Sequence, residues 1–424
     1  MAQRDSSDLV PVGGHGLPRR DWVLLPFIGI LTISILAAST ELIARFAFPS
    51  TAASPLDCLI LDDPTTGVRA IPNTVCRSKA GETELIEYRF NSCGHRAGME
   101  CGPKSAGTYR IVMVGSSFGE GIGVRVDQTY ASLLPRLLSQ RTGRKIELYN
   151  EAVQLGSPRT IDIQFEKALA AQPDLVLWTL TPWEFDNVDL ATFVPDRRPR
   201  NEAEKIWNET VYSLHNESIP AAVGAFLGTT LAAIFRSRSL FMIRHMLYES
   251  RTQLLAASLV DSPSATFLKA EPGPEALRSF KGFSGYDADI EAKAKAAGVP
   301  VVVTMLPQRA QAAMISKGHW PASYDPYKIG EEVRSIVESH GAVYLDVLHG
   351  FLREPRSETL YFPVDGHPNP SGHLFISELL SDGLASRSLG PFSSNTQSGV
   401  SPGRNQSVCG RLGQQCVLSA QRHP

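Results

Sequence analysis

Residues 109–121, YRIVMVGSSFGEG, decide how the rest of the chain is interpreted. An apolar run that stops at a glycine and two serines is typical of a buried β-strand that delivers hydroxyl groups to its carboxyl end. Far downstream, residues 365–373, DGHPNPSGH, place an aspartate two residues before a histidine in a loop that glycine and proline favour. Serine becomes nucleophilic when a base takes its proton, and that base needs an acid to orient it. Together the two segments predict acyl chemistry.

Composition sets the limits of this prediction. The chain has 424 residues, of which 43% are hydrophobic and 20% charged, so it can build one large domain with appendages. Its formal net charge of −2 provides no basic field, and no nucleic-acid partner is predicted. The sequence contains no phosphate-binding loop, dinucleotide fingerprint or metal-ligand cluster, so neither a cofactor nor a metal is predicted.

The N-terminal region contains an uncharged apolar stretch, residues 22–39, WVLLPFIGILTISILAAS. As a helix it would be about 27 Å long, at about 1.5 Å per residue, which is close to the thickness of a membrane hydrocarbon core. Arg19 and Arg20 precede it and favour a cytoplasmic N-terminus with the rest of the chain outside. We therefore expect a membrane anchor. A signal peptide cleaved after the small residues 37–39 and a buried helix are the alternatives.

Six cysteines agree with an exported chain. An even number outside the membrane indicates disulfides, although the pairing cannot be deduced from the sequence. A zinc site is the alternative, which the lack of any Cys-x-x-Cys pair makes less favourable. The cysteines fall into two groups, Cys58, Cys76, Cys93 and Cys101 after the apolar stretch, and Cys409 and Cys416 near the C-terminus.

Strand and helix patterns alternate from residue 109 onward, and the strands are continuous apolar runs. This alternation predicts a mostly parallel five-stranded sheet covered on both faces, a three-layer α/β/α fold whose sites form at the carboxyl ends of the strands. We expect strands at residues 109–114, 145–149, 174–180, 300–305 and 342–346, and helices at 129–142, 160–171, 327–340 and 370–385.

The chain divides into regions of different character. Within a helical insertion at 188–285, the apolar run 219–235 predicts a packed or interfacial helix, with a second membrane span as the alternative. The expected regions are a cytoplasmic tail at 1–21, a transmembrane anchor and exit at 22–48, an irregular Cys-containing juxtamembrane segment at 49–107, the α/β domain at 108–386 and a disordered tail at 387–424.

The pattern Gly-x-Ser-Phe-x-x-Gly after a strand, followed far downstream by Asp-x-His-Pro-Asn-x-x-Gly-His, resembles the SGNH/GDSL hydrolase family. Residues 150–156 and 173–176 resemble its intermediate blocks. The stretch Asn91-Ser-Cys-Gly-His-Arg96 also resembles one found in membrane-anchored bacterial members that often occur among exopolysaccharide genes. The resemblance implies a flavodoxin-like sheet and a single-pass protein of the bacterial inner membrane whose catalytic domain is periplasmic.

The same resemblance assigns roles to individual residues. It implies Ser117 as the nucleophile, His367 as the general base and Asp365 as the acid that orients the base. Ser116 stands where many family members have aspartate. Two alternatives remain open in the sequence: the two serines could simply cap the next helix, and His373 competes with His367 as the base.

The oxyanion hole is the weak point of the resemblance. The family uses the nucleophile's own N–H, a glycine N–H and an asparagine side chain, and the first two correspond to Ser117 and Gly156. The expected Asn-Asp pair is missing from residues 181–187, TPWEFDN, where Trp183 or Asn187 would have to substitute. Loss of one such donor costs about 100-fold or more in rate, so weak or absent activity is an alternative.

A possible substrate rim follows the fourth strand, where Arg309, His319 and Trp320 suit a sugar; a solvated loop is the alternative. The expected function is a serine esterase that deacetylates or otherwise modifies a cell-surface or secreted polysaccharide. Its expected partners are a carbohydrate or acylated small molecule, the membrane and a polysaccharide assembly machinery. Alternatives are an O-acyltransferase partner, a catalytically impaired polysaccharide-binding or assembly protein, and a lipase or thioesterase whose acyl groove the helical insertion would supply.

Overall fold

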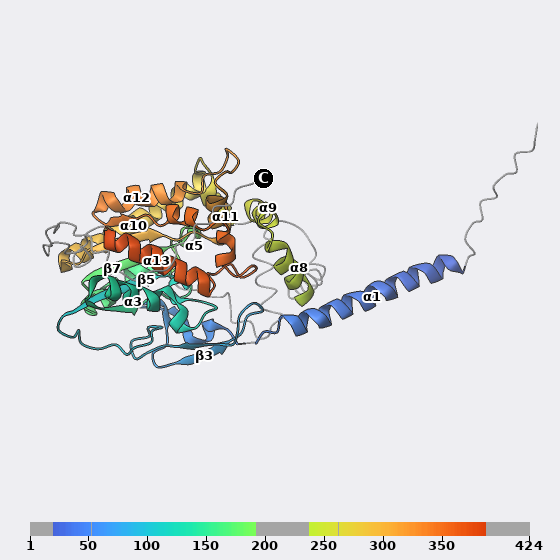
Figure 1. Ribbon diagram of the computed structural model, residues 1–424, viewed down its shortest axis with the longest axis horizontal. Helices are drawn as coiled ribbons and strands as arrows, with labels where there is room; N and C mark the ends of the chain where they lie inside the picture. Colours follow the sequence, from blue (N-terminus) through green and yellow to red (C-terminus); the bar gives the residue numbers. More distant parts are fainter. Residues whose placement is uncertain (1–19, 52, 192–236, 262, 387–424) are drawn as a thin grey trace, which may run out of the picture.

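A computed structural model describes four stretches of the chain, residues 20–51, 53–191, 237–261 and 263–386 (Figure 1). Several expectations lie outside these residues and are not addressed by the structure: nearly all of the cytoplasmic tail, the apolar run 219–235, and the C-terminal tail with Cys409 and Cys416.

A five-stranded parallel sheet forms the centre of the molecule. The strands lie in the order β6-β5-β7-β8-β9, and each neighbouring pair is parallel. This is the order of flavodoxin-like sheets, so the predicted fold class is confirmed. All residues of β7 and β8 are buried, as expected for strands covered on both faces. The strands are β5 (Thr108–Gly115), β6 (Lys145–Asn150), β7 (Leu175–Leu180), β8 (Val301–Met305) and β9 (Val343–Leu345).

Helices pack on the sheet in two groups, α3 with α13, and α4 with α10 and α12. Right-handed crossovers between parallel strands place these groups on opposite faces of the sheet. The observed strands and helices lie within two residues of those expected from the apolar patterns. The helices are α2 (Ser117–Glu120), α3 (Tyr130–Thr142), α4 (Pro158–Ala170), α5 (Pro182–Asp186), α10 (Pro274–Ala297), α11 (Arg309–Lys317), α12 (Lys328–His340) and α13 (Pro370–Ser386).

Residues 49–107 are irregular only in part, so that expectation was wrong for residues 59–89. They form two antiparallel hairpins, and Cys58–Cys76 and Cys93–Cys101 are disulfides. Their hydrophobic cluster also takes in Ile122 and Val153 of the α/β part. Strands of four or five residues give too little alternation to be recognised in a sequence. The hairpins pair β1 (Leu59–Asp63) with β2 (Gly67–Ala70) and β3 (Val75–Ser78) with β4 (Ile86–Arg89).

The N-terminal helix α1 (Asp21–Ala47) projects away from the body (Figure 1). Among the described residues, it is the only helix that is long and apolar enough to cross a membrane. The described part of the insertion is helical. It consists of α8 (Arg238–Tyr248), α9 (Arg251–Asp261), a short 3-10 helix (Pro263–Leu268) and the beginning of α10.

Candidate active site

Ser117 is the first residue of α2, two residues beyond the end of β5. The short helix ends at Gly121, whose φ of 84° lies in the left-handed region that glycine adopts without strain. Ser116, at the N-cap position, makes no capping hydrogen bond through its side chain. The helix-capping alternative for these serines is therefore not what the structure shows, and the Ser117 hydroxyl is directed elsewhere.

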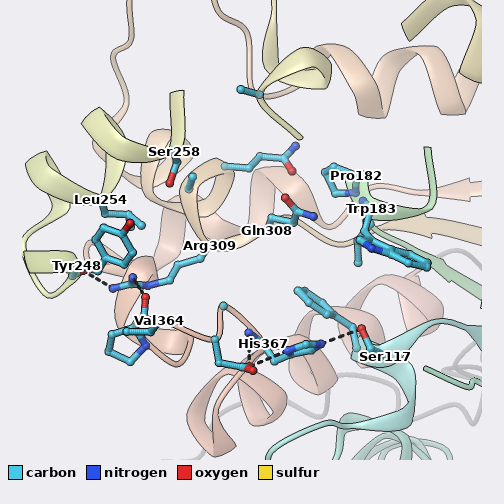
Figure 2. A pocket seen from close by; sticks show the side chains of 18 of the residues that line it. Ser117, Pro182, Trp183, Tyr248, Leu254, Ser258, Gln308, Arg309, Val364 and His367 are labelled. Carbon is cyan, nitrogen blue, oxygen red and sulfur yellow. Dashed lines mark hydrogen bonds and ion pairs between the residues drawn. The ribbon is translucent and has the colours of Figure 1, made fainter. Parts of the chain in front are cut away.

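The structure brings Ser117, His367 and Asp365 together (Figure 2). Ser117 Oγ lies 2.8 Å from His367 Nε2, and His367 Nδ1 lies 2.7 Å from Asp365 Oδ1. Gly366, with a φ of 83°, turns the chain tightly between the aspartate and the histidine. Asp365 Oδ1 also accepts the backbone N–H of His367 at 3.1 Å, which fixes the carboxylate against the ring. A hydroxyl, a base and an orienting acid are thus within hydrogen-bond distance of one another.

The charge on Asp365 is stabilised by its neighbour. Burial favours the neutral acid, but the His367 ring and its hydrogen bonds outweigh burial and hold the pKa of Asp365 below its ordinary value. The carboxyl is therefore ionised at neutral pH, as an acid that orients an imidazole must be.

His373, the competing histidine, is fully buried away from Ser117. Its Nδ1 accepts the backbone N–H of Tyr130 at 3.2 Å. Burial lowers the pKa of His373 to about 3, and the charges of Arg96 and His367 lower it further. A neutral ring that supports the first turn of α3 is not a base for Ser117.

Glu82, which sequence reasoning missed, holds the segment that carries Asp365. Its side chain is 2% exposed and accepts the backbone N–H groups of Val364, at 2.9 Å, and Asp365, at 3.0 Å. The ring of His245, from α8, lies 2.6 Å from the same carboxylate. Glu82 lies in the hairpin region without helical or strand periodicity around it, so no signal in the sequence marks it.

Arg309 lines the pocket, but its guanidinium is bound largely by the protein itself, and its expected contact with substrate stays a prediction. Its guanidinium donates to three backbone carbonyls, those of Glu358 at 3.1 Å, Pro363 at 2.5 Å and Tyr248 at 2.5 Å. Burial lowers the pKa of Arg309, which nevertheless keeps a strongly basic guanidinium. The side chain ties α8 to the loop that precedes Asp365.

His319 and Trp320 are not among the residues that line the pocket, so their expected contact with substrate stays a prediction. The exposed His319 ring lies 3.1 Å from the Lys317 carbonyl. Trp320 packs edge-on against Tyr327 and against an apolar cluster that includes the pocket residues Leu254 and Leu268. Neither residue is part of the wall that surrounds Ser117.

The Asn91–Arg96 stretch supports the turn that carries Ser117. Arg96 is buried and donates to the carbonyls of Glu120, at 2.9 Å, Gly121 and Val124, at 2.6 Å. Its guanidinium also lies 4.3 Å from the centre of the Tyr88 ring. Arg96, from the hairpin region, therefore fixes the backbone that follows Ser117 through these hydrogen bonds.

Two of the expected oxyanion donors are already engaged within the protein. The N–H of Gly156 donates to the Val153 carbonyl at 2.8 Å, and Gly156 does not line the pocket. The side-chain amide of Asn187 donates to the Trp183 carbonyl at 3.0 Å. These hydrogen bonds contradict the roles expected for Gly156 and Asn187. Trp183 lines the pocket with Ser117, as Figure 2 shows.

Leu155 is a pocket residue that the sequence did not indicate. It has a φ of 67°, a conformation uncommon for any residue except glycine. The preceding N–H, that of Gln154, donates to the buried Glu120 carboxylate, which fixes this turn beneath the pocket. Within the described ranges, no acceptor is found for the Leu155 N–H. Leu155 therefore supplies a backbone N–H without an acceptor in the described residues, one position before Gly156.

Two buried glutamates lie in the turns that follow β5 and β7. Burial raises the pKa of Glu120 to about 7, although Arg96 and the Gln154 N–H lower it in part. Burial also raises the pKa of Glu184 to about 7, against the lowering effect of the Thr181 and Ser116 hydroxyls. Both carboxyls therefore titrate near neutral pH, although neither contacts the Ser117 hydroxyl.

A cavity of about 370 Å³ opens beside Ser117 and His367. This volume is near the lower end of the range for small-molecule sites. Figure 2 shows that α8 and α9 supply one wall, through Tyr248, Leu254 and Ser258. The apolar part of the lining consists of Phe118, Leu155, Pro182, Trp183, Leu254, Ala265, Leu268, Ala310, Pro363 and Val364.

Comparison with known proteins gives distant structural likenesses. No family model matches the sequence, and no curated protein matches it. An acetyl xylan esterase from Geobacillus stearothermophilus is similar at 12% identity and a TM-score of 0.35, covering 66% of this chain and 95% of its own. The esterase EstA from Pseudoalteromonas sp. is similar at 11% identity and a TM-score of 0.34, covering 65% and 97%. A putative lipolytic protein of the G-D-S-L family from Desulfitobacterium hafniense is similar at 11% identity and a TM-score of 0.30, covering 65% and 99%.

Proposed function

We propose that this chain is a serine esterase that works through an acyl-enzyme. The observation that supports it most is the pair of hydrogen-bond distances, 2.8 Å from Ser117 Oγ to His367 Nε2 and 2.7 Å from His367 Nδ1 to Asp365 Oδ1, at the edge of a cavity. Such an arrangement activates a hydroxyl that is otherwise a poor nucleophile.

In the proposed reaction, Ser117 Oγ attacks the acyl carbonyl while His367 Nε2 takes the hydroxyl proton. His367 then gives this proton to the leaving alcohol oxygen as the bond between acyl carbon and alcohol breaks. Water attacks the acyl-enzyme next, again with His367 as the base, and releases the acid. Asp365 remains ionised and stabilises the imidazolium in both steps.

The negative charge on the carbonyl oxygen requires donors. We assign the N–H of Ser117, at the start of a helix, and the N–H of Leu155, and give the third position to the Trp183 indole N–H. Ser117 and Leu155 both line the cavity, as does Trp183. This set replaces the Gly156 and asparagine donors that the family resemblance implied.

The substrate we propose is an acylated carbohydrate, most simply an acetyl ester on a cell-surface or secreted polysaccharide. The small, mostly apolar cavity suits a short acyl group. The Asn91–Arg96 stretch resembles exopolysaccharide-associated members of the family, which favours a polysaccharide. The apolar helix α1 and the two disulfides support a periplasmic body anchored in a bacterial inner membrane.

A fluorophosphonate probe tests the proposal. The full chain in detergent would be labelled and digested, and the modified peptide mapped by mass spectrometry. We expect label on Ser117 in the native chain and in Ser116→Ala, and none in Ser117→Ala, which should also lose ester hydrolysis. A folded native chain that takes up no label, together with unchanged hydrolysis in Ser117→Ala, would leave a non-catalytic polysaccharide-binding protein as the better interpretation.

A further inference from the structure

We propose that α8 lies in the headgroup layer of the membrane that α1 crosses, so that the pocket receives its ester from the membrane surface. The partner of this surface is a phospholipid bilayer, and the substrate class is an ester carried on a lipid or held at the bilayer. The inference rests on the proposed esterase function and on α1 as an anchor.

The depth of α1 in the bilayer follows from its charges. Residues 22–40 are uncharged, between Asp21 and Glu41. As a helix this stretch is about 28 Å long, which matches a hydrocarbon core of about 30 Å. Glu41 therefore lies where the helix leaves the hydrocarbon and enters the headgroup layer.

The amino end of α8 is bound at this depth. The Glu41 carboxylate accepts the Ser237 hydroxyl at 2.7 Å and the backbone N–H groups of Arg238, at 3.1 Å, and Ser239, at 3.0 Å. These groups lie at the start of α8, whose first N–H groups have no partner within the helix. Figure 1 shows α8 beside the carboxyl end of α1, between that end and the body.

One face of α8 is apolar and exposed. Ile243, Met246 and Leu247 are neighbours on the helix surface and are 47%, 66% and 46% exposed. The opposite face is occupied, since Phe241 packs on Phe48 and His245 contacts Glu82. An amphipathic helix that starts in the headgroup layer buries such a face among the lipids. This depth is why we assign the face to the bilayer rather than to a second copy of the chain.

The same helix leads to the pocket. Tyr248 ends α8, one helix length of about 16 Å from the Glu41 end, and lines the cavity. Its carbonyl is held by Arg309, which also holds the Pro363 carbonyl in the loop before Asp365. An ester at the bilayer surface thus lies close to Ser117 without leaving the membrane.

Fluorescence quenching in nanodiscs of phosphatidylethanolamine and phosphatidylglycerol tests the lipid contact. The full chain would carry Met246→Cys labelled with an environment-sensitive dye, with Cys409 and Cys416 replaced by serine. Leu277→Cys is the matched control, because Leu277 is 55% exposed on α10, on the body. Nitroxide lipids should quench the dye at 246 at least threefold more than at 277. Equal quenching at both positions, or shielding at 246 that depends on protein concentration rather than on lipid, overturns the proposal.

An activity comparison tests the substrate class. Met246→Asp should lower hydrolysis of a diacylglycerol-linked ester in vesicles at least tenfold, and that of water-soluble p-nitrophenyl acetate less than twofold. Leu277→Asp should change neither rate. An equal loss on both substrates, or no loss on either, contradicts delivery from the membrane. A native chain that hydrolyses no acetate contradicts the esterase proposal instead, and the quenching result then still decides the lipid contact.

Discussion

Two turns at the same edge of the sheet share a pattern and differ in what it does. After β5, Ser117 is followed three residues later by Glu120, and after β7, Thr181 is followed by Glu184 in the same way. Because Gly115 pairs with Thr179, Ser117 and Thr181 each lie two residues past paired positions. In the second turn, the Glu184 carboxylate accepts the Thr181 N–H at 2.9 Å and its hydroxyl at 2.5 Å, which closes a capping box.

In the first turn Ser116 is the N-cap, and Ser117 and Glu120 form no such box. Glu120 accepts the Gln154 N–H instead, while the Ser117 hydroxyl bonds to His367. Arg96 takes up the carbonyls that follow. The two turns differ in register, because Thr181 is the N-cap of its helix while Ser117 is the first residue after its N-cap, and they differ in the distant segments that contact them. Reactivity at this sheet edge depends on both.

The largest expected effect comes from replacing His367, the hydrogen-bond partner of the Ser117 hydroxyl. His367→Gln should lower kcat for p-nitrophenyl acetate about 10⁴-fold, because the Ser117 hydroxyl loses its base. His349→Gln is the control, since His349 also lies 2.7 Å from an aspartate, Asp346, but outside the pocket. If both variants keep the native rate while their circular dichroism is unchanged, His367 is not the base.

A smaller effect is expected at the second turn, which supplies the proposed indole donor. Trp183→Phe should lower kcat about 100-fold, in line with the loss of one oxyanion donor. The KM should change much less. Asn187→Ala should leave kcat within about twofold, because its amide is bonded to the Trp183 carbonyl. Steady-state kinetics that reverse the two results would move the donor to Asn187.

Removing the hydrogen bond between the Gln154 N–H and Glu120 should lower kcat moderately. Glu120→Ala removes the acceptor of the Gln154 N–H and frees the Leu155 turn, and we expect kcat to fall about tenfold. Glu120→Gln should stay near the native rate, because its amide oxygen still accepts that N–H. The kcat values of the two variants would be compared at pH 7, at a temperature at which thermal unfolding shows that both variants are folded. A defect as large in the glutamine variant would mean that the charge, rather than the acceptor, is required.

The closed box should influence stability more than activity. Because the pKa of Glu184 is raised to about 7 in the folded chain, the folded state retains a proton that the unfolded state loses above its ordinary value of 4.5. The free energy of unfolding should therefore fall as pH rises from 4.5 to 7 and then level off. Glu184→Gln should remove up to about 3 kcal/mol of this fall, with the slopes from Glu120 and Glu291 remaining.

Urea unfolding at pH 5, 6.5 and 8 measures this difference. The exposed Glu275→Gln on α10 is the matched control and should follow the native curve at each pH. If the free energy of unfolding of Glu184→Gln depends on pH as that of the native chain does, the Glu184 carboxyl does not titrate in this range.

The sheet and the Ser117–His367–Asp365 cluster could be predicted because each rests on a short local pattern. Buried parallel strands are continuous apolar runs, and the Asp-x-His spacing with an intervening glycine describes a single turn. The oxyanion donors could not be predicted in this way. Whether the N–H of Gly156 or of Leu155 is available depends on the Val153 carbonyl and on Glu120, and neither bond follows from spacing alone.

The scaffold residues were missed for the same reason. Glu82 lies in a short hairpin and acts through backbone N–H groups of Val364 and Asp365, some 280 residues away in sequence. The expectation that Arg309 binds a sugar rests on the ability of a guanidinium to hydrogen-bond to hydroxyls. Here backbone carbonyls from two other segments converge on it.

The contact between Arg96 and the turn after Ser117 limits how this catalytic unit can be inherited. A recombination event that copied only the strands and helices of the sheet would leave the carbonyls of Glu120 and Val124 without their donor in a buried place. The smallest segment that recombination can transfer with these hydrogen bonds intact therefore includes the Cys93–Cys101 loop, which carries Arg96. In this way a loop closed by a disulfide and a turn of the sheet domain form one inherited unit.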